Sequence, residues 1–344
     1  MEKIIKIIQP LFLIVLIIAL LIILKGFLIP FSYGFLIALI IYPICKKLEN
    51  KKVPRSIAIA ISIFIVAVIL STIIFIFILQ LQVLNKELPE IAIRLNQLLL
   101  KVQNWIDTSF GLSIIEQNSV VDSTVKNFVA NIGNHLSKFF SVATETLFYI
   151  IILPIYSYLI LFYREKLVDF VGSLIPKKQK ENLYKVISET IQTYFNYIKG
   201  MLWVYIIVGV LNSIGLLILG IDYAILFGIT AAFMTIIPYF GIIISALLPM
   251  SMAWIETNNP LYAVAVMGIF VVVQYLEANI IFPYIVGKQL GINTLVTLTT
   301  IFIGAVIWGI SGMILFLPFV AMLKIISGHI DDLKPLHNLL KSTS

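Results

Sequence analysis

The chain has 344 residues, of which 60% are hydrophobic and only 12% are charged, and its formal net charge is +7. Soluble globular domains are about 45–50% apolar and about 25% charged, and with a mean hydropathy of +1.06 this chain carries more apolar surface than a soluble core can bury. The composition excludes a soluble protein and predicts a polytopic membrane protein. The single cysteine excludes an intrachain disulfide and a cysteine-built metal site.

Long runs of Leu, Ile, Val and Phe predict an all-α protein, because membrane β-barrels show short alternating segments instead. The N-terminus resembles a signal peptide, but it lacks a small-residue cleavage site and runs on into further apolar sequence, so we expect an uncleaved first helix. The predicted membrane spans are residues 10–24, 27–44, 57–79, 143–162, 201–219, 223–254, 262–282 and 295–326. The sixth and the last of these are broken near their middles.

Basic residues orient the spans. The loop at residues 45–55 holds five basic side chains against one acidic side chain, which places it in the cytoplasm by the positive-inside rule. A pair of spans precedes this loop, so the N-terminus is predicted to be cytoplasmic, and so is the C-terminus if both broken segments return to the side from which they start. The positive charge is thus typical of a membrane protein, and we expect no nucleic-acid partner.

Residues 80–142 are predicted to form an extracytoplasmic insert. Apolar residues recur there at helical spacing, at Ile91, Leu95, Leu98, Val102 and Trp105, and again at Val121, Val125, Phe128, Ile132 and Leu136. Two amphipathic helices broken near Gly111 fit this pattern best. They pack on the bundle or on a neighbouring subunit, or else they present a surface to a partner.

Residues 143–200 contain one span and a basic cytoplasmic segment with an apolar stripe at Ile187, Ile191, Tyr194 and Ile198. This segment is predicted to be a helix. It either lies flat in the inner interface with its lysines near anionic headgroups, or connects two spans while packed on the bundle.

The two broken segments are each too long for one simple span. The breaks contain Pro238, Tyr239 and Gly241 in the first, and Gly309, Ser311 and Gly312 in the second. Proline removes a backbone donor and glycine permits a reversal. Paired apolar segments interrupted in this way point to a transporter's binding site, so we expect two re-entrant hairpins, with ordinary kinks in full crossings as the alternative.

Glu277 is a formal charge within an otherwise apolar span. A charge in hydrocarbon costs about 2.5–3.5 kcal/mol by insertion scales, so an intramembrane carboxylate is a functional candidate by default. Gln274 shares its helix face at a spacing of three, whereas Asn279 points nearly the opposite way. These three are candidate solute- or ion-binding residues. The alternative for Glu277 is a structural partner for Lys288 or for a backbone break.

Other polar residues of the spans have simpler expected roles. Asn212 and Thr230 are expected to hydrogen-bond between helices. Asp222 is expected to cap the helix that begins at Tyr223.

Several motifs of the last third resemble the autoinducer-2 exporter family. They are Ile-Pro-Tyr-Phe-Gly at 237–241, Gln274 with Glu277-Ala-Asn279-Ile-Ile-Phe-Pro283, Gly287-Lys288-Gln-Leu-Gly291, and Gly304 with Gly309-Ile-Ser-Gly312-Met and Pro318. Residues 291–294 depart from the family, which often has a His-Pro pair there. The resemblance implies a transporter. Members of the family are linked to different substrates, including sodium and proton exchange. It adds Pro283, Gly287 and Lys288 as candidate residues of the loop after the span.

The motifs that could indicate an enzyme are incomplete in this sequence. Gly309-Ile-Ser311-Gly312 matches the short Gly-x-Ser-Gly of rhomboid-like intramembrane proteases, but such a serine needs a histidine base in a neighbouring span. All three histidines fall outside the predicted spans. The sequence has no nucleotide-binding loop, zinc motif or carboxylate pair, so we expect no enzyme, no cofactor and no metal site.

These patterns predict N-terminal transmembrane helices at 1–79, an extracytoplasmic helical insert at 80–142, a span with a basic cytoplasmic helix at 143–200, a transport core at 201–326 and a cytoplasmic tail at 327–344. The predicted function is secondary transport of a small polar solute, monovalent cation or proton across the bacterial inner membrane, coupled to H⁺ or Na⁺, by a homo-oligomer such as a pentamer. The alternatives are a membrane organising protein that acts through its extracytoplasmic helices, and a channel, although no ring of acidic residues or filter-like run is seen.

Overall fold

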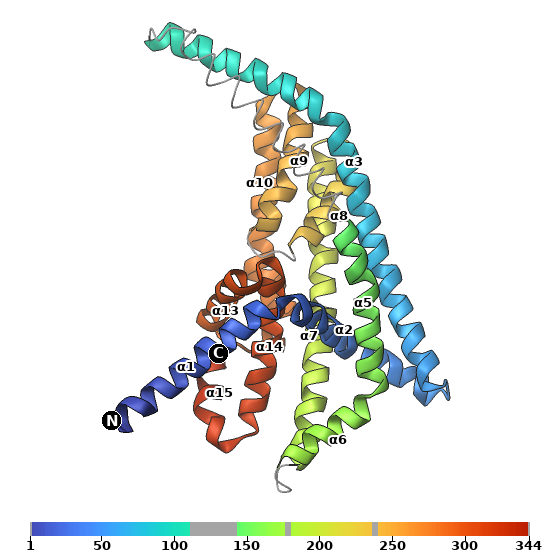
Figure 1. The fold of residues 1–344 in the computed structure, drawn as a ribbon. Helices are drawn as coiled ribbons and strands as arrows, with labels where there is room; N and C mark the ends of the chain where they lie inside the picture. Colours follow the sequence, from blue (N-terminus) through green and yellow to red (C-terminus); the bar gives the residue numbers. More distant parts are fainter. Residues whose placement is uncertain (1, 111–142, 176–179, 236–239, 343–344) are drawn as a thin grey trace. The chain divides into compact units, whose positions relative to one another are not determined.

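A computed structural model describes residues 2–110, 143–175, 180–235 and 240–342, and every regular element in these ranges is a helix (Figure 1). The predicted all-α class is confirmed. The chain divides into two compact units. Unit 1 comprises Met1–Ile69, Phe148–Val204 and Ile280–Ser344, and unit 2 comprises Leu70–Leu147 and Tyr205–Asn279.

Two long helices contribute to both units, α3 (Arg55–Phe110) and α7 (Lys180–Ile218). The other helices of unit 1 are α1 (Glu2–Ile23), α2 (Lys25–Asn50), most of α5 (Ala143–Phe162), α6 (Arg164–Leu174), α11 (Phe282–Ile285), α12 (Gly287–Leu290), α13 (Thr294–Trp308), α14 (Ile310–Gly328) and α15 (Lys334–Leu340), with a 3₁₀ turn, η3, at Asp331–Leu333. Unit 2 adds α8 (Ala224–Met234), α9 (Phe240–Thr257), α10 (Pro260–Leu276) and the start of a π-helical segment, η2 (Glu277–Ile281).

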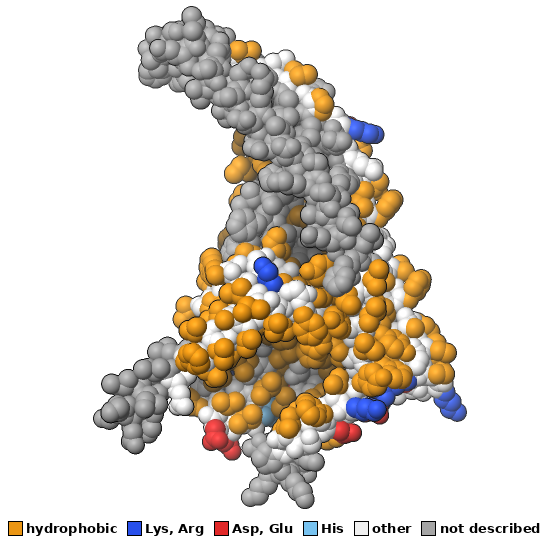
Figure 2. Space-filling view, viewed as in Figure 1, with side chains coloured by type: hydrophobic (Ala, Val, Ile, Leu, Met, Phe, Trp, Pro, Cys, Tyr) orange, Lys and Arg blue, Asp and Glu red, His pale blue; other side chains and the backbone are white. Residues whose placement is uncertain are grey.

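Five segments of the described chain are long and apolar enough to cross a membrane, namely Lys25–Asn50, Arg55–Ile76, Asn182–Ile218, Pro260–Ile285 and Ile310–Gly328. Shorter apolar helices are Ile151–Phe162, Ala224–Met234 and Thr294–Trp308. Their outward faces are apolar too: Phe64, Ile151, Val271, Phe302 and Val306 are all exposed. Figure 2 shows a surface on which hydrophobic side chains far outnumber charged ones. Because lipid tails require such a surface, the chain is a multi-pass membrane protein.

Unit 1 is held together around α2. Ala38, Ile41 and Cys45 of α2 are buried with Ile59 of α3 and Leu161 of α5. Small residues bring the backbones close, since a Cβ on Gly34 would lie 2.6 Å from the Cβ of Tyr156. The Ser157 hydroxyl donates to the Gly34 carbonyl at 2.9 Å. Close approach with a hydroxyl bond is typical of helix packing in membranes.

A charged corner lies where α2, α3, α5 and α6 meet within unit 1. Arg164 donates to the Glu49 carboxylate at 2.6 Å, and Arg55 pairs with Glu165 at 3.1 Å and donates to the Leu161 carbonyl at 2.9 Å. Burial alone lowers the pKa of the Arg164 guanidinium, but its hydrogen bond and charge attraction to Glu49 outweigh burial and raise that pKa. Arg164 therefore stays charged and ties the end of α2 to the start of α6.

The span predicted at 57–79 matches the apolar segment Arg55–Ile76, but the helix that contains it is longer than the span. The span predicted at 57–79 continues into the predicted insert as one helix, α3, of 56 residues or about 84 Å. A fall in hydropathy marks where apolar surroundings end, not where backbone hydrogen bonding ends, and one proline, Pro89, does not stop a helix this long. The described part of α3 reaches Phe110, and the expected break near Gly111 lies outside the described ranges. The second predicted insert helix lies in residues 111–142, outside the described ranges.

The separate helix expected to lie flat in the inner interface is also not formed. α7 runs without a break from Lys180 to Ile218, so the basic segment and the following span are one helix. Tyr194 is buried against Leu36, Leu315 and Met322 of α2 and α14. The alternative, a connector helix packed on the bundle, fits this segment better, because Tyr194 of its apolar stripe is buried and Ile198 packs against the same cluster.

Candidate functional site

The first broken segment folds as a helical hairpin in unit 2. α8 and α9 pack along each other (Figure 1). The backbone N–H of Asp222, just before α8, donates to the Glu256 carboxylate near the end of α9 at 3.3 Å. The two ends of the segment therefore meet. The capping prediction is wrong, because Tyr223, with φ at 57°, is the N-cap of α8 and no side-chain cap bond forms.

The tip of this hairpin explains one glycine of the motif. Pro238 and Tyr239 lie in residues 236–239, outside the described ranges. Gly241 follows them and is buried, and a Cβ on Gly241 would overlap the carbonyl of Met234 at the end of α8. Glycine is required there because the two helices approach so closely.

α7 packs on α8 through small residues in unit 2. A Cβ on Gly209 would lie 3.3 Å from that of Ala232, and a Cβ on Gly228 would overlap the Ser213 hydroxyl. Ser213 donates to the Gly209 carbonyl at 2.7 Å, and Thr230 donates to the Leu226 carbonyl at 3.0 Å. The bond found for Thr230 is therefore within its own helix, not between helices as expected.

Asn212 occupies the buried face of α7. Its side chain is fully buried, and neither Oδ1 nor Nδ2 has a hydrogen-bond partner in the described part of the chain. The interhelical bond expected from the sequence is not formed. Leaving a buried polar group unpaired costs about 1–3 kcal/mol, so this amide calls for an explanation beyond packing.

α10 carries Glu277 on its core face. The helix begins with Pro260 after Asn259, whose side-chain oxygen accepts the Leu261 N–H at 3.0 Å. Its buried residues are Val266, Phe270 and Val273, spaced four and three apart, and Glu277 follows four residues later. The carboxylate therefore continues an apolar stripe that contacts the main core cluster of unit 2, formed around Leu216, Phe227 and Ala253.

The Glu277 side chain is only 9% exposed, and its Oε2 has no hydrogen-bond partner among the residues described. The helix changes at this residue, because Glu277–Ile281 is π-helical before α11 begins. Pro283 lacks an N–H and its ring crowds the carbonyl four residues back, which favours such a local widening. Single π-helical turns are frequent at functional sites.

The three polar residues predicted together divide into two groups. Gln274 is half-buried one turn before Glu277. Asn279 is exposed, and its Nδ2 donates to the Tyr275 carbonyl of its own helix at 2.9 Å. The opposite orientation of Asn279, expected from its spacing, is seen in the structure. This amide is satisfied locally and lies outside the arrangement around Glu277.

The second broken segment folds as a hairpin in unit 1. α13 and α14 pack along each other and the chain reverses at Gly309, whose φ of 61° and ψ of −138° suit glycine alone. Gly304 and Gly312 face each other so closely that a Cβ on either would overlap the other's carbonyl. Ser311 is half-buried at the start of α14. The three glycines thus explain why the two helices can lie together.

The loop after the α10 span belongs to unit 1. Pro283 is exposed in α11, Gly287 begins α12, and the side chain of Lys288 lies outside the described residues. Lys324 of α14 donates to the Leu290 carbonyl at 2.8 Å beside Gly291, where φ is 57°. The C-terminal segment closes on the same loop, because Asn293 Nδ2 and N–H donate to the carbonyls of Leu339 and Leu340.

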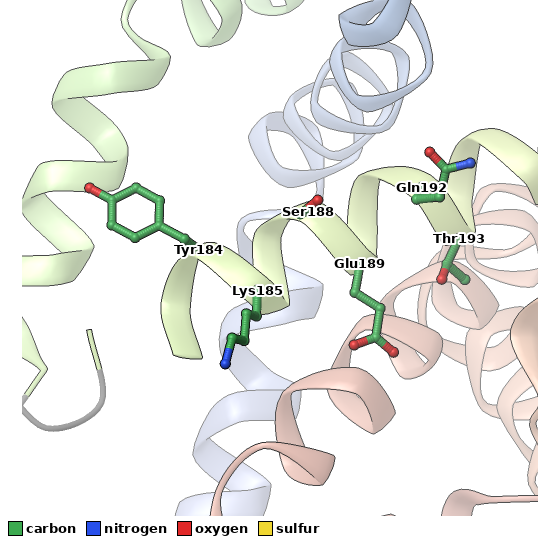
Figure 3. Close-up of a pocket in the computed structure, with 6 residues that line it drawn as sticks. All are labelled: Tyr184, Lys185, Ser188, Glu189, Gln192 and Thr193. Atoms are coloured by element: carbon green, nitrogen blue, oxygen red, sulfur yellow. The ribbon is translucent and has the colours of Figure 1, made fainter. Parts of the chain in front are cut away.

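A hollow on α7 was not predicted. It measures about 580 Å³ and is open, and its lining residues (Figure 3) are Tyr184, Lys185, Ser188, Glu189, Gln192 and Thr193. Glu189 lies 3.4 Å from the Nε2 of His329 at the end of α14. All lining residues come from one helix and none is a predicted binding residue, so the buried carboxylate of unit 2 remains the stronger candidate.

Comparison with known proteins places these features in context. A family model described as AI-2E family transporter matches residues 11–332. A Bacillus subtilis protein described as "Putative transport protein YrrI" is 26% identical over 330 residues, which are 92% of this chain and 90% of that protein. Another from the same organism, "Putative transport protein YueF", is 28% identical over 306 residues, 85% of this chain and 82% of that protein.

Proposed function

The chain belongs to the AI-2E family of transporters, and on that premise we propose that it is a secondary transporter of a small polar solute or ion, coupled to H⁺ or Na⁺, in the bacterial inner membrane with both termini cytoplasmic. The observation that carries the proposal is the buried Glu277 carboxylate, whose Oε2 has no hydrogen-bond partner in the described chain. Intramembrane carboxylates are rare and usually mark ion or substrate paths.

Coupling to a cation follows from the chemistry of this carboxylate. A carboxylate on an apolar stripe is stable only if it is protonated or if a cation lies beside it. Glu277 can therefore carry a proton or coordinate a monovalent cation, and its charge state changes with occupancy. The half-buried Gln274 one turn earlier supplies a neutral amide to the same site. Asn279 is left out of the site because it is exposed and bonded to its own helix.

The proposal assigns the conformational change of transport to the two hairpins, α8–α9 and α13–α14. Interrupted helices of this kind line binding sites in transporters, and irregular backbone is tolerated at membrane depth only in protein or beside a cavity. In the proposal each hairpin re-enters the membrane and gates access to its own unit. We extend the proposal to a homo-oligomer, such as a pentamer.

The test is flux in liposomes that contain the purified protein. Liposomes loaded with a pH-sensitive dye are given a Na⁺ gradient, and proton movement is followed with the wild type, Glu277→Gln and Glu256→Gln. Glu277→Gln cannot ionise, so its gradient-driven flux is expected to fall to the level of protein-free liposomes. Glu256 is exposed at the base of the hairpin, so Glu256→Gln is expected to keep wild-type flux.

If Glu277→Gln keeps the wild-type flux, the carboxylate has no part in coupling. If the wild type itself moves no H⁺ in response to the Na⁺ gradient, the exchange of Na⁺ for H⁺ through this site is wrong.

A further inference from the structure

A second buried polar side chain in unit 2 has no role in the proposal so far. Asn212 is fully buried, and its Oδ1 and Nδ2 both lack partners in the described chain. Val208 and Leu216, four residues to either side, are fully buried on the same face of α7. A leucine would fit this face at lower cost, because it has the apolar character of its neighbours and leaves no polar group unpaired.

The helices that lead to Asn212 and to Glu277, α7 and α10, contact each other in unit 2. Leu216 near the end of α7 shares the core cluster with Val266 and Phe270 in α10. Gly215 is in direct contact with Ile269. That cluster also contains Ile221 and Ala224, which follow α7, and Met252 and Ala253 near the end of α9. α7 therefore runs toward this end of unit 2 and α10 runs away from it, so the two helices are antiparallel.

The helical rise gives the depth of each polar residue below the Gly215–Ile269 contact. Asn212 is three residues before Gly215, or about 4.5 Å, and Glu277 is eight residues after Ile269, or about 12 Å. Both displacements are in the same direction because the helices are antiparallel. The two side chains are thus about 7–8 Å apart along the helix axes, each on the buried face of its helix.

We propose that Asn212 forms part of the transport path in unit 2 and there binds a hydroxyl group, to which its Nδ2 donates and from which its Oδ1 accepts. The proposal rests on the proposed transport function and extends it beyond Glu277. A carboxamide has both a donor and an acceptor to satisfy. A bare cation would pair with Oδ1 alone and leave the NH₂ group unpaired, whereas a hydroxyl satisfies both. The hydroxyl belongs to water or to a hydroxyl-bearing solute.

Cysteine labelling tests this without knowledge of the natural solute. Cys45 is the single cysteine of the chain and is buried, so Cys45→Ala gives a background without thiols. In it, Asn212→Cys is compared with Leu216→Cys, one turn away in the apolar cluster. A small charged methanethiosulfonate reagent, applied to protein in liposomes, is expected to label Asn212→Cys and to leave Leu216→Cys unlabelled. Equal lack of labelling at both positions would overturn the proposal.

The source of the hydroxyl is decided with Asn212 in place. Glycerol, erythritol and ribose are added in turn to the wild type and to Asn212→Leu in detergent, and the thermal unfolding midpoint is measured. A rise in the midpoint of the wild type but not of Asn212→Leu identifies a hydroxyl-bearing solute as the ligand, and equal midpoints with and without the solutes identify water. Both outcomes support a hydroxyl at Asn212.

Asn212→Leu gives a second readout that does not depend on cysteine. Its flux is expected to fall to the level of protein-free liposomes, while Asn279→Leu, which replaces an exposed amide bonded to its own helix, keeps wild-type flux. Wild-type flux in Asn212→Leu would overturn the proposal and leave transport through Glu277 intact. If wild-type protein shows no flux and Asn212→Cys is still labelled, transport fails and the hydroxyl site stands.

Discussion

Glu277 and Asn212 differ from the other buried polar side chains of unit 2 in how they are bonded. Ser213 and Thr230 donate to carbonyls one turn back, so their hydroxyls are satisfied without a second helix. Asn279 uses the same solution on an exposed face. Periodicity correctly predicted that Glu277 and Asn279 point in different directions. It did not predict the unpaired state of Asn212, because that depends on which side chains the neighbouring helices place opposite it.

Asn212→Leu is expected to stabilise the folded protein. Removing an unpaired buried amide and filling its place with an apolar side chain of similar size should raise the free energy of unfolding by about 1–3 kcal/mol. The thermal unfolding midpoint in detergent measures this. Asn279→Leu, which removes a satisfied amide, serves as the control and should not raise the midpoint. These measurements are made without a hydroxyl-bearing solute, and a lower midpoint for Asn212→Leu would show that the amide is bonded even then, as it is if its ligand is water.

Helix boundaries were predicted well where a residue changes the backbone and poorly where only polarity changes. Gly309 marks the reversal between α13 and α14. By contrast, the predicted span ends near residues 80 and 200 are not helix ends, because α3 and α7 continue through them. Hydropathy reports the surroundings of a helix, while its ends depend on backbone hydrogen bonding.

Substitution by alanine is expected to have opposite effects on stability at two glycines, one at a hairpin reversal and one within a helix. Gly309 has a φ of 61° and a ψ of −138°, so Gly309→Ala should lower the free energy of unfolding by about 1–3 kcal/mol. Gly268 lies in α10, and a Cβ there would meet nothing within 4 Å. Gly268→Ala should therefore raise the free energy of unfolding by about 0.5–1 kcal/mol. Thermal unfolding of both variants in detergent checks the pair, and equal effects would contradict the strain assigned to Gly309.

For the whole molecule, the orientation of the chain in the membrane is predicted from charge and hydropathy. Five basic residues between positions 45 and 55 face a single acidic one, and basic loops stay in the cytoplasm. Two hairpins that each return to their starting side leave the number of crossings unchanged, and α8–α9 and α13–α14 both reverse direction. With this predicted orientation, the long α3 would extend beyond the outer surface of the membrane.

Reporter fusions test this orientation. Alkaline phosphatase fused after Phe110 is expected to be active, because that position is predicted to be extracytoplasmic, and the same enzyme fused after Ser344 is expected to be inactive. A green fluorescent protein should show the reverse pattern, since it fluoresces only when it folds in the cytoplasm. Ser344 is cytoplasmic whether both broken segments return or both cross, so the phosphatase is also fused after Asn258, between α9 and α10. Activity at Asn258 is expected if the first hairpin returns to its starting side, and inactivity there would favour a full crossing.

The sequence by itself determined the membrane class, the helical fold, the positions of both breaks and the candidate carboxylate Glu277. These follow from composition, spacing and residue type, which act locally along the chain. Only the tertiary structure decided that α3 and α7 are continuous, that Gly304 faces Gly312 and that Asn212 is buried without a partner. Such properties depend on contacts between residues far apart in the chain. Burial and pairing are set by the neighbours that folding brings together.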